Sequence, residues 1–171
     1  MYTYSPSDVS ILIAGHEISG LADGTFVTIE PEEKFFKSKR NADGSISRTL
    51  QRTQPHKLTL SIAQTSPSND YLNLLLNLDK TFADAIVPAY IKDWSSGTSI
   101  LIAQIWIDSL PQIVYANGVE MREWELCFTS EIISLSGENQ DGLYQTFLKT
   151  VSSGLPSFDN LRTYASSLIG G

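Results

Sequence analysis

Carboxylates, histidines and a cysteine are the residues of this chain whose chemistry could support catalysis or metal binding. The carboxylates cluster around Pro31, as Glu30, Glu32 and Glu33. Paired carboxylates can act as general acid and base or bind a divalent cation. This cluster lies in a segment that reads as a turn, and runs of charge are commonly solvated. We therefore expect an exposed acidic turn, with no catalytic and no metal-binding residues.

The histidines and the cysteine do not form a recognisable site in the sequence. His16 and His56 lie beside a glycine and a proline, and neither is at metal-ligand spacing from a cysteine or another histidine. Cys127 lies in an apolar run, where we expect a buried hydrophobic residue in a strand. The sequence contains no nucleophile elbow, phosphate-binding loop or dinucleotide fingerprint. We therefore expect that the protein is not an enzyme and binds no cofactor.

Charge is distributed very unevenly along the chain. The net charge is −7, but residues 34–57 hold seven of the 12 Lys and Arg and only one carboxylate, Asp43. That segment carries +6 and the rest of the chain −13. Two copies are therefore electrostatically complementary, because the basic segment of one can contact the acidic body of the other. A contact between two different surfaces can repeat from copy to copy and so form rings or filaments. The alternative is a solvated charged loop.

Length and composition limit the class of protein. A chain of 171 residues with 42% hydrophobic content fits one domain, or one domain with an extension. No apolar run reaches the ~18 residues of a membrane span, and the first residues lack the features of a signal peptide, so a soluble intracellular product without membrane insertion is expected. The acidic net charge argues against general nucleic-acid binding, which depends on Lys and Arg that neutralise phosphates.

Most of the chain is predicted to be strand. Strands are expected at residues 9–14, 26–31, 34–40, 45–53, 57–63, 86–92, 99–108 and 121–135, the last with a bend or bulge. The third and fourth flank Asn41–Gly44, where Gly44 suits a positive φ, and so form a long hairpin arm over residues 33–53. The arm mixes a few hydrophobic residues with its cations on both faces. Because these are too few to bury either face within one domain, we expect part of the arm to be covered by a partner.

One helix is expected over residues 67–82, with Ser66 as its cap and Pro67 in its first turn. The residues at helical spacing, which would pack on the sheet as core, are Tyr71, Leu74, Leu75, Leu78 and Phe82. The composition changes after Gly137, and residues 137–171 are interpreted as a C-terminal extension with two short helices.

Several turn and strand motifs together resemble the tail tube proteins of contractile-tailed bacteriophages. They are Tyr4-Ser5-Pro6-x-Asp8-Val9, the turn and strand of residues 20–27, the hairpin closed by Asp43-Gly44, residues 58–69, Ile91-Lys92-Asp93 and Arg122-Glu123-Trp124. Each motif alone is common, and their order and spacing over residues 4–136 make the likeness. The resemblance implies a mainly β fold, a tail-tube-type β-barrel or sandwich with one flanking α-helix, in a domain of residues 1–136.

The resemblance also implies a structural function. Six copies would join their inner sheets into a ring, and rings would stack into a tube through which the genome and the tape measure protein pass. The tail sheath protein would lie outside, with baseplate and tail-terminator proteins at the tube ends. The protein would be in the host cytoplasm before assembly and in the virion tail after it. The acidic body would give the tube a bore to which DNA does not adhere.

In that family a long hairpin reaches the adjoining ring, and residues 35–50 occupy the matching place. The residues expected at the subunit and ring interface are Lys34, Phe35, Phe36, Lys37, Lys39, Arg40, Asp43, Gly44, Arg48, Leu50 and Arg52. Two other functions stay open. An inner-tube protein of a bacterial secretion or contractile injection system would share the fold, and a nucleic-acid-binding module would use the basic arm with Phe35 and Phe36 as stacking partners.

Overall fold

The computed structural model describes residues 5–51, 54–129 and 131–134, together with residues 145, 148, 149, 151 and 152. A 3-10 turn at Pro6–Asp8 precedes the first strand. The strands are β1 (Val9–Ile13), β2 (His16–Glu17), β3 (Val27–Pro31), β4 (Phe36–Arg40), β5 (Ile46–Leu50), β6 (His56–Ala63), β7 (Val87–Asp93), β8 (Ser99–Ser109), β9 (Met121–Phe128) and β10 (Glu131–Ser134). Helix α1 spans Ser68–Phe82.

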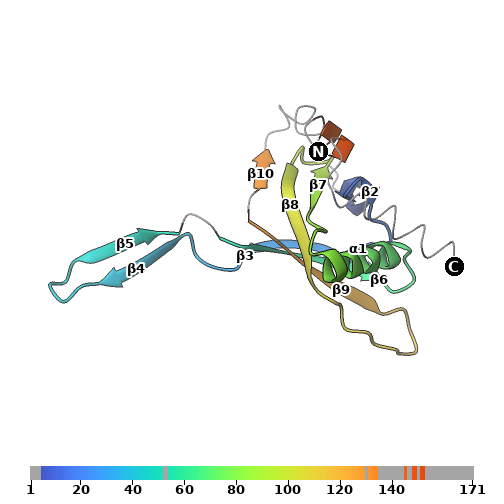
Figure 1. Cartoon of the computed structure of the whole chain (residues 1–171), viewed down its shortest axis with the longest axis horizontal. Helices are drawn as coiled ribbons and strands as arrows, with labels where there is room; N and C mark the ends of the chain where they lie inside the picture. The colour runs from blue at the N-terminus through green and yellow to red at the C-terminus, as the bar shows by residue number, and fades with distance from the viewer. Residues whose placement is uncertain are drawn as a thin grey trace.

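The strands form one large antiparallel sheet and one separate hairpin. The sheet has the order β2-β1-β7-β8-β9-β6-β3, with β10 paired to β8, while β4 and β5 pair with each other and with no other described strand. Helix α1 lies against the sheet, and the β4–β5 hairpin extends far from it (Figure 1). The predicted mainly β fold is confirmed.

Strand β6 illustrates how the sequence pattern determines the sheet. Its residues alternate between buried and partly exposed along the whole strand, with Leu58, Leu60 and Ile62 buried. This follows because successive strand residues face opposite sides of the sheet. On the neighbouring strand β9, Trp124 and Leu126 join the same core. The strand predicted at residues 57–63 is confirmed.

Strand β8 has different neighbours along its two halves. Residues Ser99–Ile102 pair with β10, and the later residues pair with β9, with a register shift between Ile107 and Ser109. Strands β9 and β10 are thus two parts of one segment that breaks after Phe128. The bend predicted within residues 121–135 is confirmed.

Helix α1 covers the sheet with a different stripe from the predicted one. Leu75 and Leu78 are buried as expected, but Phe82 is 50% exposed, so its assignment to the core was wrong. Leu72 and Leu76 are buried instead. The run of leucines from 74 to 76 makes the apolar side of the helix broad, and contact with the sheet selects which part of it is buried.

Polar contacts hold the start of α1 on the sheet. The hydroxyl of Ser66 donates to the carbonyl of Ser19 at 2.7 Å, and the N–H of Ser19 donates to the hydroxyl of Ser68 at 2.9 Å. The indole N–H of Trp124 donates to the side-chain oxygen of Asn69 at 3.0 Å. The predicted Ser66 cap is replaced by Pro67, although the Ser66 hydroxyl accepts from the N–H of Ser68 at 3.2 Å.

The predicted C-terminal extension, residues 137–171, lies outside the described residues except for five helical positions between 145 and 152. One of these, Val151, packs against buried Tyr90 and Leu101. Within the part of the chain that the structure describes, no helix combines the length and the apolar character needed to cross a bilayer.

Candidate subunit interface

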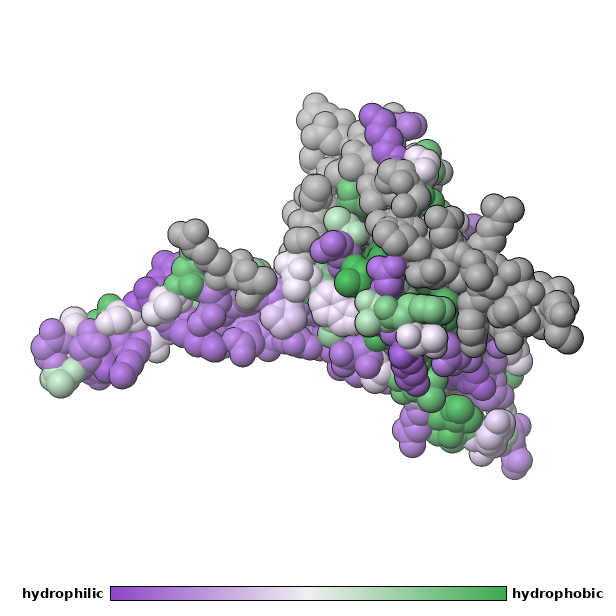
Figure 2. All heavy atoms as spheres, in the orientation of Figure 1, coloured by the Kyte–Doolittle hydropathy of each residue, from purple (hydrophilic) through white to green (hydrophobic). Residues whose placement is uncertain are grey.

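The β4–β5 hairpin stands apart from the rest of the protein. Every residue of both strands is exposed, and the hairpin surface is largely hydrophilic with separate hydrophobic patches (Figure 2). At its base the N–H of Gln51 donates to the carbonyl of Phe35 at 2.9 Å, and the N–H of Glu32 donates to that of Pro55 at 3.1 Å. Because an isolated two-stranded hairpin is only marginally stable in water, a hairpin this exposed is a candidate surface for contact with another molecule.

The tip of the hairpin is closed by its own hydrogen bonds. Gly44 has a φ of +84°, as the sequence predicted. The side-chain amide of Asn41 donates to the hydroxyls of Ser45 and Ser47 at 2.9 and 2.7 Å. The carboxylate of Asp43 accepts from the hydroxyl and the N–H of Ser45 at 2.6 and 2.9 Å, and these bonds lower the pKa of Asp43. The turn is therefore ordered before any partner binds.

The register of the hairpin separates its side chains onto two unlike faces, since cross-strand partners lie on the same side of a β-ribbon. One face, here called the arginine face, is made of the pairs Phe36 with Leu50, Ser38 with Arg48, and Arg40 with Ile46. The other, the lysine face, is made of the pairs Lys37 with Thr49 and Lys39 with Ser47. The sequence predicted faces of mixed character, and the structure corrects this: on the strands, every hydrophobic side chain is on the arginine face.

Contacts within the hairpin support this division. The guanidinium carbon of Arg48 lies 3.3 Å from the centroid of the Phe36 ring, on the arginine face. On the lysine face, the ammonium of Lys37 is 2.9 Å from the carboxylate of Glu33, so part of its charge is neutralised within the subunit. The charge of Arg40 meets no carboxylate among the described residues. The arginine face thus presents guanidinium groups beside exposed hydrophobic side chains.

The remaining predicted interface residues lie at the base and tip of the hairpin. Lys34 is held at the base by a hydrogen bond from the buried side chain of Gln54 to its carbonyl. Phe35 is 49% exposed, and Arg52 lies outside the described residues. Ile46 was not among the predicted interface residues, although it is the most exposed hydrophobic residue described in the hairpin, at 73%. Its pairing with Arg40 on the arginine face becomes visible only from the register.

A second exposed hydrophobic surface lies at the connection between β8 and β9. This connection, residues 110–120, projects from the body on a different side from the hairpin (Figure 1). Hydrophobic side chains are exposed on and beside this connection, at Leu110, Ile113, Val114, Tyr115, Val119 and Met121. Nothing in the sequence pattern marked this surface, because the segment has no regular periodicity.

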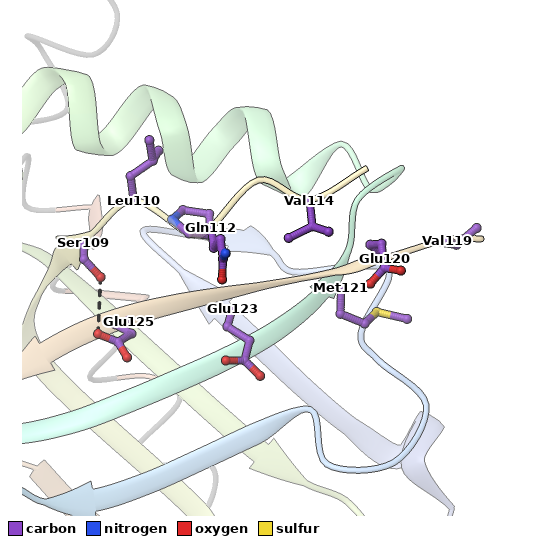
Figure 3. Close-up of a pocket in the computed structure, with 10 residues that line it drawn as sticks. Ser109, Leu110, Gln112, Val114, Val119, Glu120, Met121, Glu123 and Glu125 are labelled. Atoms are coloured by element: carbon purple, nitrogen blue, oxygen red, sulfur yellow. Dashed lines mark hydrogen bonds between the residues drawn. The ribbon is translucent and has the colours of Figure 1, made fainter. Parts of the chain in front are cut away.

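The connection and β9 enclose a groove of about 530 Å³ (Figure 3). Pairing of β8 with β9 ends at Ser109 and Glu125, so on that edge the earlier residues of β9 face the connection, while their other edge stays paired with β6. At one end the hydroxyl of Ser109 donates to Glu125 at 3.3 Å. Toward the other end lie Val114 and Met121, with Glu120 beside them (Figure 3).

The groove is acidic as well as apolar. Glu120, Glu123 and Glu125 line it, and none of its described lining residues is Lys or Arg. Glu125 is paired with Lys57 at 2.5 Å, and this bond lowers the pKa of Glu125 and raises that of Lys57. Neither Glu120 nor Glu123 has an ion-pair partner in residues 5–51, 54–129 and 131–134. The groove therefore presents two uncompensated carboxylates among hydrophobic side chains.

The residues considered for catalysis or metal binding do not converge. Glu30, Glu32 and Glu33 are exposed, and no group of three potential ligands among the described residues is placed to hold a metal ion. Cys127 is buried, and its burial raises the pKa of the thiol to about 11. His56 is also buried and stacks on a core phenylalanine ring. The three glutamates thus form a solvated turn, and Cys127 and His56 belong to the buried part of the subunit.

Known proteins share the fold of this chain. No protein-family model matches it. Structural protein ORF10 of Pseudomonas phage KPP10 is 29% identical over 147 residues, which cover 81% of this chain and 84% of that protein. A chain in the structure of the tube-terminating cap of the anti-feeding prophage matches with a TM-score of 0.57 and 12% identity, covering 80% of this chain and 93% of that one. The chain has a tail-tube-type fold. A chain of the PVC sheath/tube terminator, from an extracellular contractile injection system, matches similarly, with a TM-score of 0.50, 12% identity, and coverage of 78% and 98%. The mainly β, tail-tube-type fold implied by the sequence motifs is therefore confirmed.

Proposed function

We propose that this chain is a structural subunit of a phage tail that assembles with copies of itself into a tube. The observation that carries the proposal is the isolated basic hairpin on an acidic body, in a chain with a tail-tube-type fold. The similarity to a phage structural protein supports the same conclusion. Because the hairpin and the body are different surfaces, their contact is heterologous and repeats from copy to copy.

The finer arrangement follows the tail tube family. Six copies form a ring, rings stack through the hairpins, and the genome and the tape measure protein pass through the bore. Among the described strands β3 pairs only with β6, so its outer edge carries no strand from that part of the chain, and an open edge favours pairing with another chain. This supports ring formation by joined sheets. The acidic excess outside the hairpin suits a bore that DNA does not bind, since it offers few cations to phosphates.

Electron microscopy of the purified protein tests this function. In negative stain we expect tubes of uniform bore, and a chain that stays monomeric at high concentration and low salt would refute the proposal. A variant in which Lys37, Lys39, Arg40 and Arg48 are all replaced by Glu should remain folded by circular dichroism and form no tubes. Unchanged tubes from this variant would exclude an electrostatic function of the hairpin.

A tube terminator is the second candidate, favoured by a specific observation. The two solved structures described above are a tube-terminating cap and a sheath/tube terminator. A terminator would form rings that do not stack, so single rings in the micrographs would select it over a tube subunit. A tube protein of a contractile injection system would form the same tubes as a phage protein, and neighbouring genes would separate the two.

Nucleic-acid binding by the hairpin is a more distant alternative. A short duplex would be retarded in gel shifts at moderate salt if the hairpin were a DNA-binding arm. A tube subunit should show no shift, because its acidic body repels the same polymer.

A further inference from the structure

We infer that the arginine face of the hairpin docks into the groove beside β9 of a second copy of this chain. The inference rests on the proposed function and names the two surfaces that would make its repeating contact. The sequence identified the hairpin only as a whole, and it identified no receiving surface.

The two surfaces match in hydrophobic character. On the arginine face Phe36, Ile46 and Leu50 are 41%, 73% and 52% exposed. At the groove Val114 and Met121 are 43% and 41% exposed. Exposed hydrophobic patches of this kind mark interaction sites, and burying one against the other removes both from water.

The two surfaces also match in charge. Arg40 and Arg48 supply two guanidinium groups beside the hydrophobic residues of the hairpin. Glu120 and Glu123 supply two carboxylates that are not paired within the described part of the subunit. Guanidinium and carboxylate groups form charge-assisted hydrogen bonds of defined geometry. No Lys or Arg among the described residues that line the groove opposes this pairing.

The lysine face fits the groove less well. On the strands its side chains are Lys37, Lys39, Ser47 and Thr49, none of them hydrophobic. Lys37 already pairs with a carboxylate of its own subunit. The groove places Val114, Val119 and Met121 beside its carboxylates, so it matches the face that combines hydrophobic and cationic side chains. The arginine face is therefore selected, and the lysine face stays in water.

The occupant is another copy and not the hairpin of the same subunit. The hairpin and the β8–β9 connection leave the body on different sides (Figure 1). Every residue of both hairpin strands is exposed, so the hairpin does not fold back onto its own groove. Each subunit thus has one donor surface and one acceptor surface, which is what an unlimited series of identical contacts requires.

Charge reversal on matched positions tests the docking. The variant R40E/R48E changes the arginine face, and K37E/K39E makes the same change in net charge on the opposite face of the same strands. We expect the first to raise the protein concentration needed for assembly at least tenfold in sedimentation assays, and the second to change it less than threefold. Equal effects of the two variants would overturn the inference, since net charge alone would then explain them.

The assignment of the groove is tested by reversing its charges and by combining this change with the reversed hairpin. E120K/E123K should weaken assembly as R40E/R48E does, while leaving Glu125 and its bond to Lys57 in place. The combined variant R40E/R48E/E120K/E123K should restore assembly, because its reversed surfaces match again. Normal assembly of E120K/E123K, or no rescue in the combined variant, would overturn the assignment of the groove as the receiving surface. The proposed function would still stand in that case if the parent chain formed tubes.

Cross-linking gives a readout that does not depend on tubes. The variants I46C and V114C, mixed and treated with a short bismaleimide, should give a covalent dimer that neither gives alone. T49C, on the lysine face, replaces I46C as the control and should give at least fivefold less dimer. The native Cys127 is buried and should not interfere. Equal cross-linking of I46C and T49C would overturn the docking geometry even if the parent chain assembled.

Discussion

Asn69→Ala is expected to destabilise the subunit more than any other single change at the start of helix α1. Asn69 is 4% exposed, and its side chain makes three hydrogen bonds. Its amide donates to the carbonyls of Ala63 and Ser66 at 2.8 and 3.0 Å, and its oxygen accepts from the indole of Trp124 at 3.0 Å. The residue therefore joins the helix, the end of β6 and the buried face of β9.

The cost can be worked out contact by contact. The carbonyl of Ala63 keeps the N–H of Ser66, and the carbonyl of Ser66 keeps the N–H of Asn69, so neither becomes unsatisfied. Losing these two amide bonds costs about 0.5–1 kcal/mol each. The indole of Trp124 is 1% exposed and is left without an acceptor, which costs about 1–3 kcal/mol more. The sum is about 2–5 kcal/mol, or a melting temperature lower by about 4–20 °C for a chain of this length.

Urea unfolding followed by circular dichroism measures this change, at a concentration where sedimentation shows single subunits. Asn73→Ala is the matched control, because Asn73 is exposed one turn further along α1. The control should change the free energy of unfolding by less than about 0.5 kcal/mol. In a double-mutant cycle, Asn69→Ala should cost less when Trp124 is already Phe. A loss below about 0.5 kcal/mol for Asn69→Ala, or an equal loss for Asn73→Ala, would refute the reasoning.

Three further predictions concern other parts of the subunit. Gly20→Ala should destabilise it by about 2 kcal/mol or more, since φ is +70° and the new Cβ would lie 2.6 Å from Ser66 Cβ; Gly24→Ala, with φ +97° and open space around it, should cost less in the same thermal unfolding assay. Burial tends to raise the pKa of Asp93, but hydrogen bonds from two following serines outweigh it and lower the pKa to about 2. The ionised Asp93 should therefore stabilise the fold by less than about 1 kcal/mol after solvent screening. This contribution should be present above pH ~4, the pKa of Asp93 in the unfolded chain, and be lost as the pH falls toward about 2. Asp93→Asn should flatten that part of the curve of unfolding free energy against pH, and an unchanged curve would contradict the assignment. Cys127, whose pKa burial raises to about 11, should react with a thiol reagent at pH 8 roughly a hundredfold more slowly in the folded protein than in urea, and equal rates would show that the thiol is accessible.

Much of the fold was predictable because its local patterns agree with its tertiary contacts. Strand β6 alternates in sequence and in burial, so Leu58, Leu60 and Ile62 all face the core of a strand that was predicted from its pattern. The hairpin followed from Asn41–Gly44 between two extended segments. The stripe of α1 was only partly predicted, because periodicity does not decide which side of a broad apolar helix meets a sheet. Phe82, near the end of the helix, was the clearest error.

The candidate interface was less predictable than the fold. The sequence identified the hairpin from its charge, but the separation into two faces depends on the register between β4 and β5. A shift of one residue would have exchanged every partner. The groove depends on where β8 stops pairing with β9, at Ser109 and Glu125, and on an irregular connection alongside. No local pattern encodes such a meeting of segments, so Glu120 and Glu123 could not be recognised as interface residues from the sequence.

The small size of the arginine face has a consequence for the timing of assembly. Six side chains on a narrow ribbon offer far less area than the ~800 Å² per partner of a stable pairwise complex. Under the docking proposed here, two free subunits would therefore meet and separate quickly. Subunits already held together in one layer would present several ribbons at fixed spacing, and their combined avidity would exceed that of any single contact by orders of magnitude. Growth would then show a nucleation threshold, with layers added as units to an existing end and few stray pairs formed beforehand.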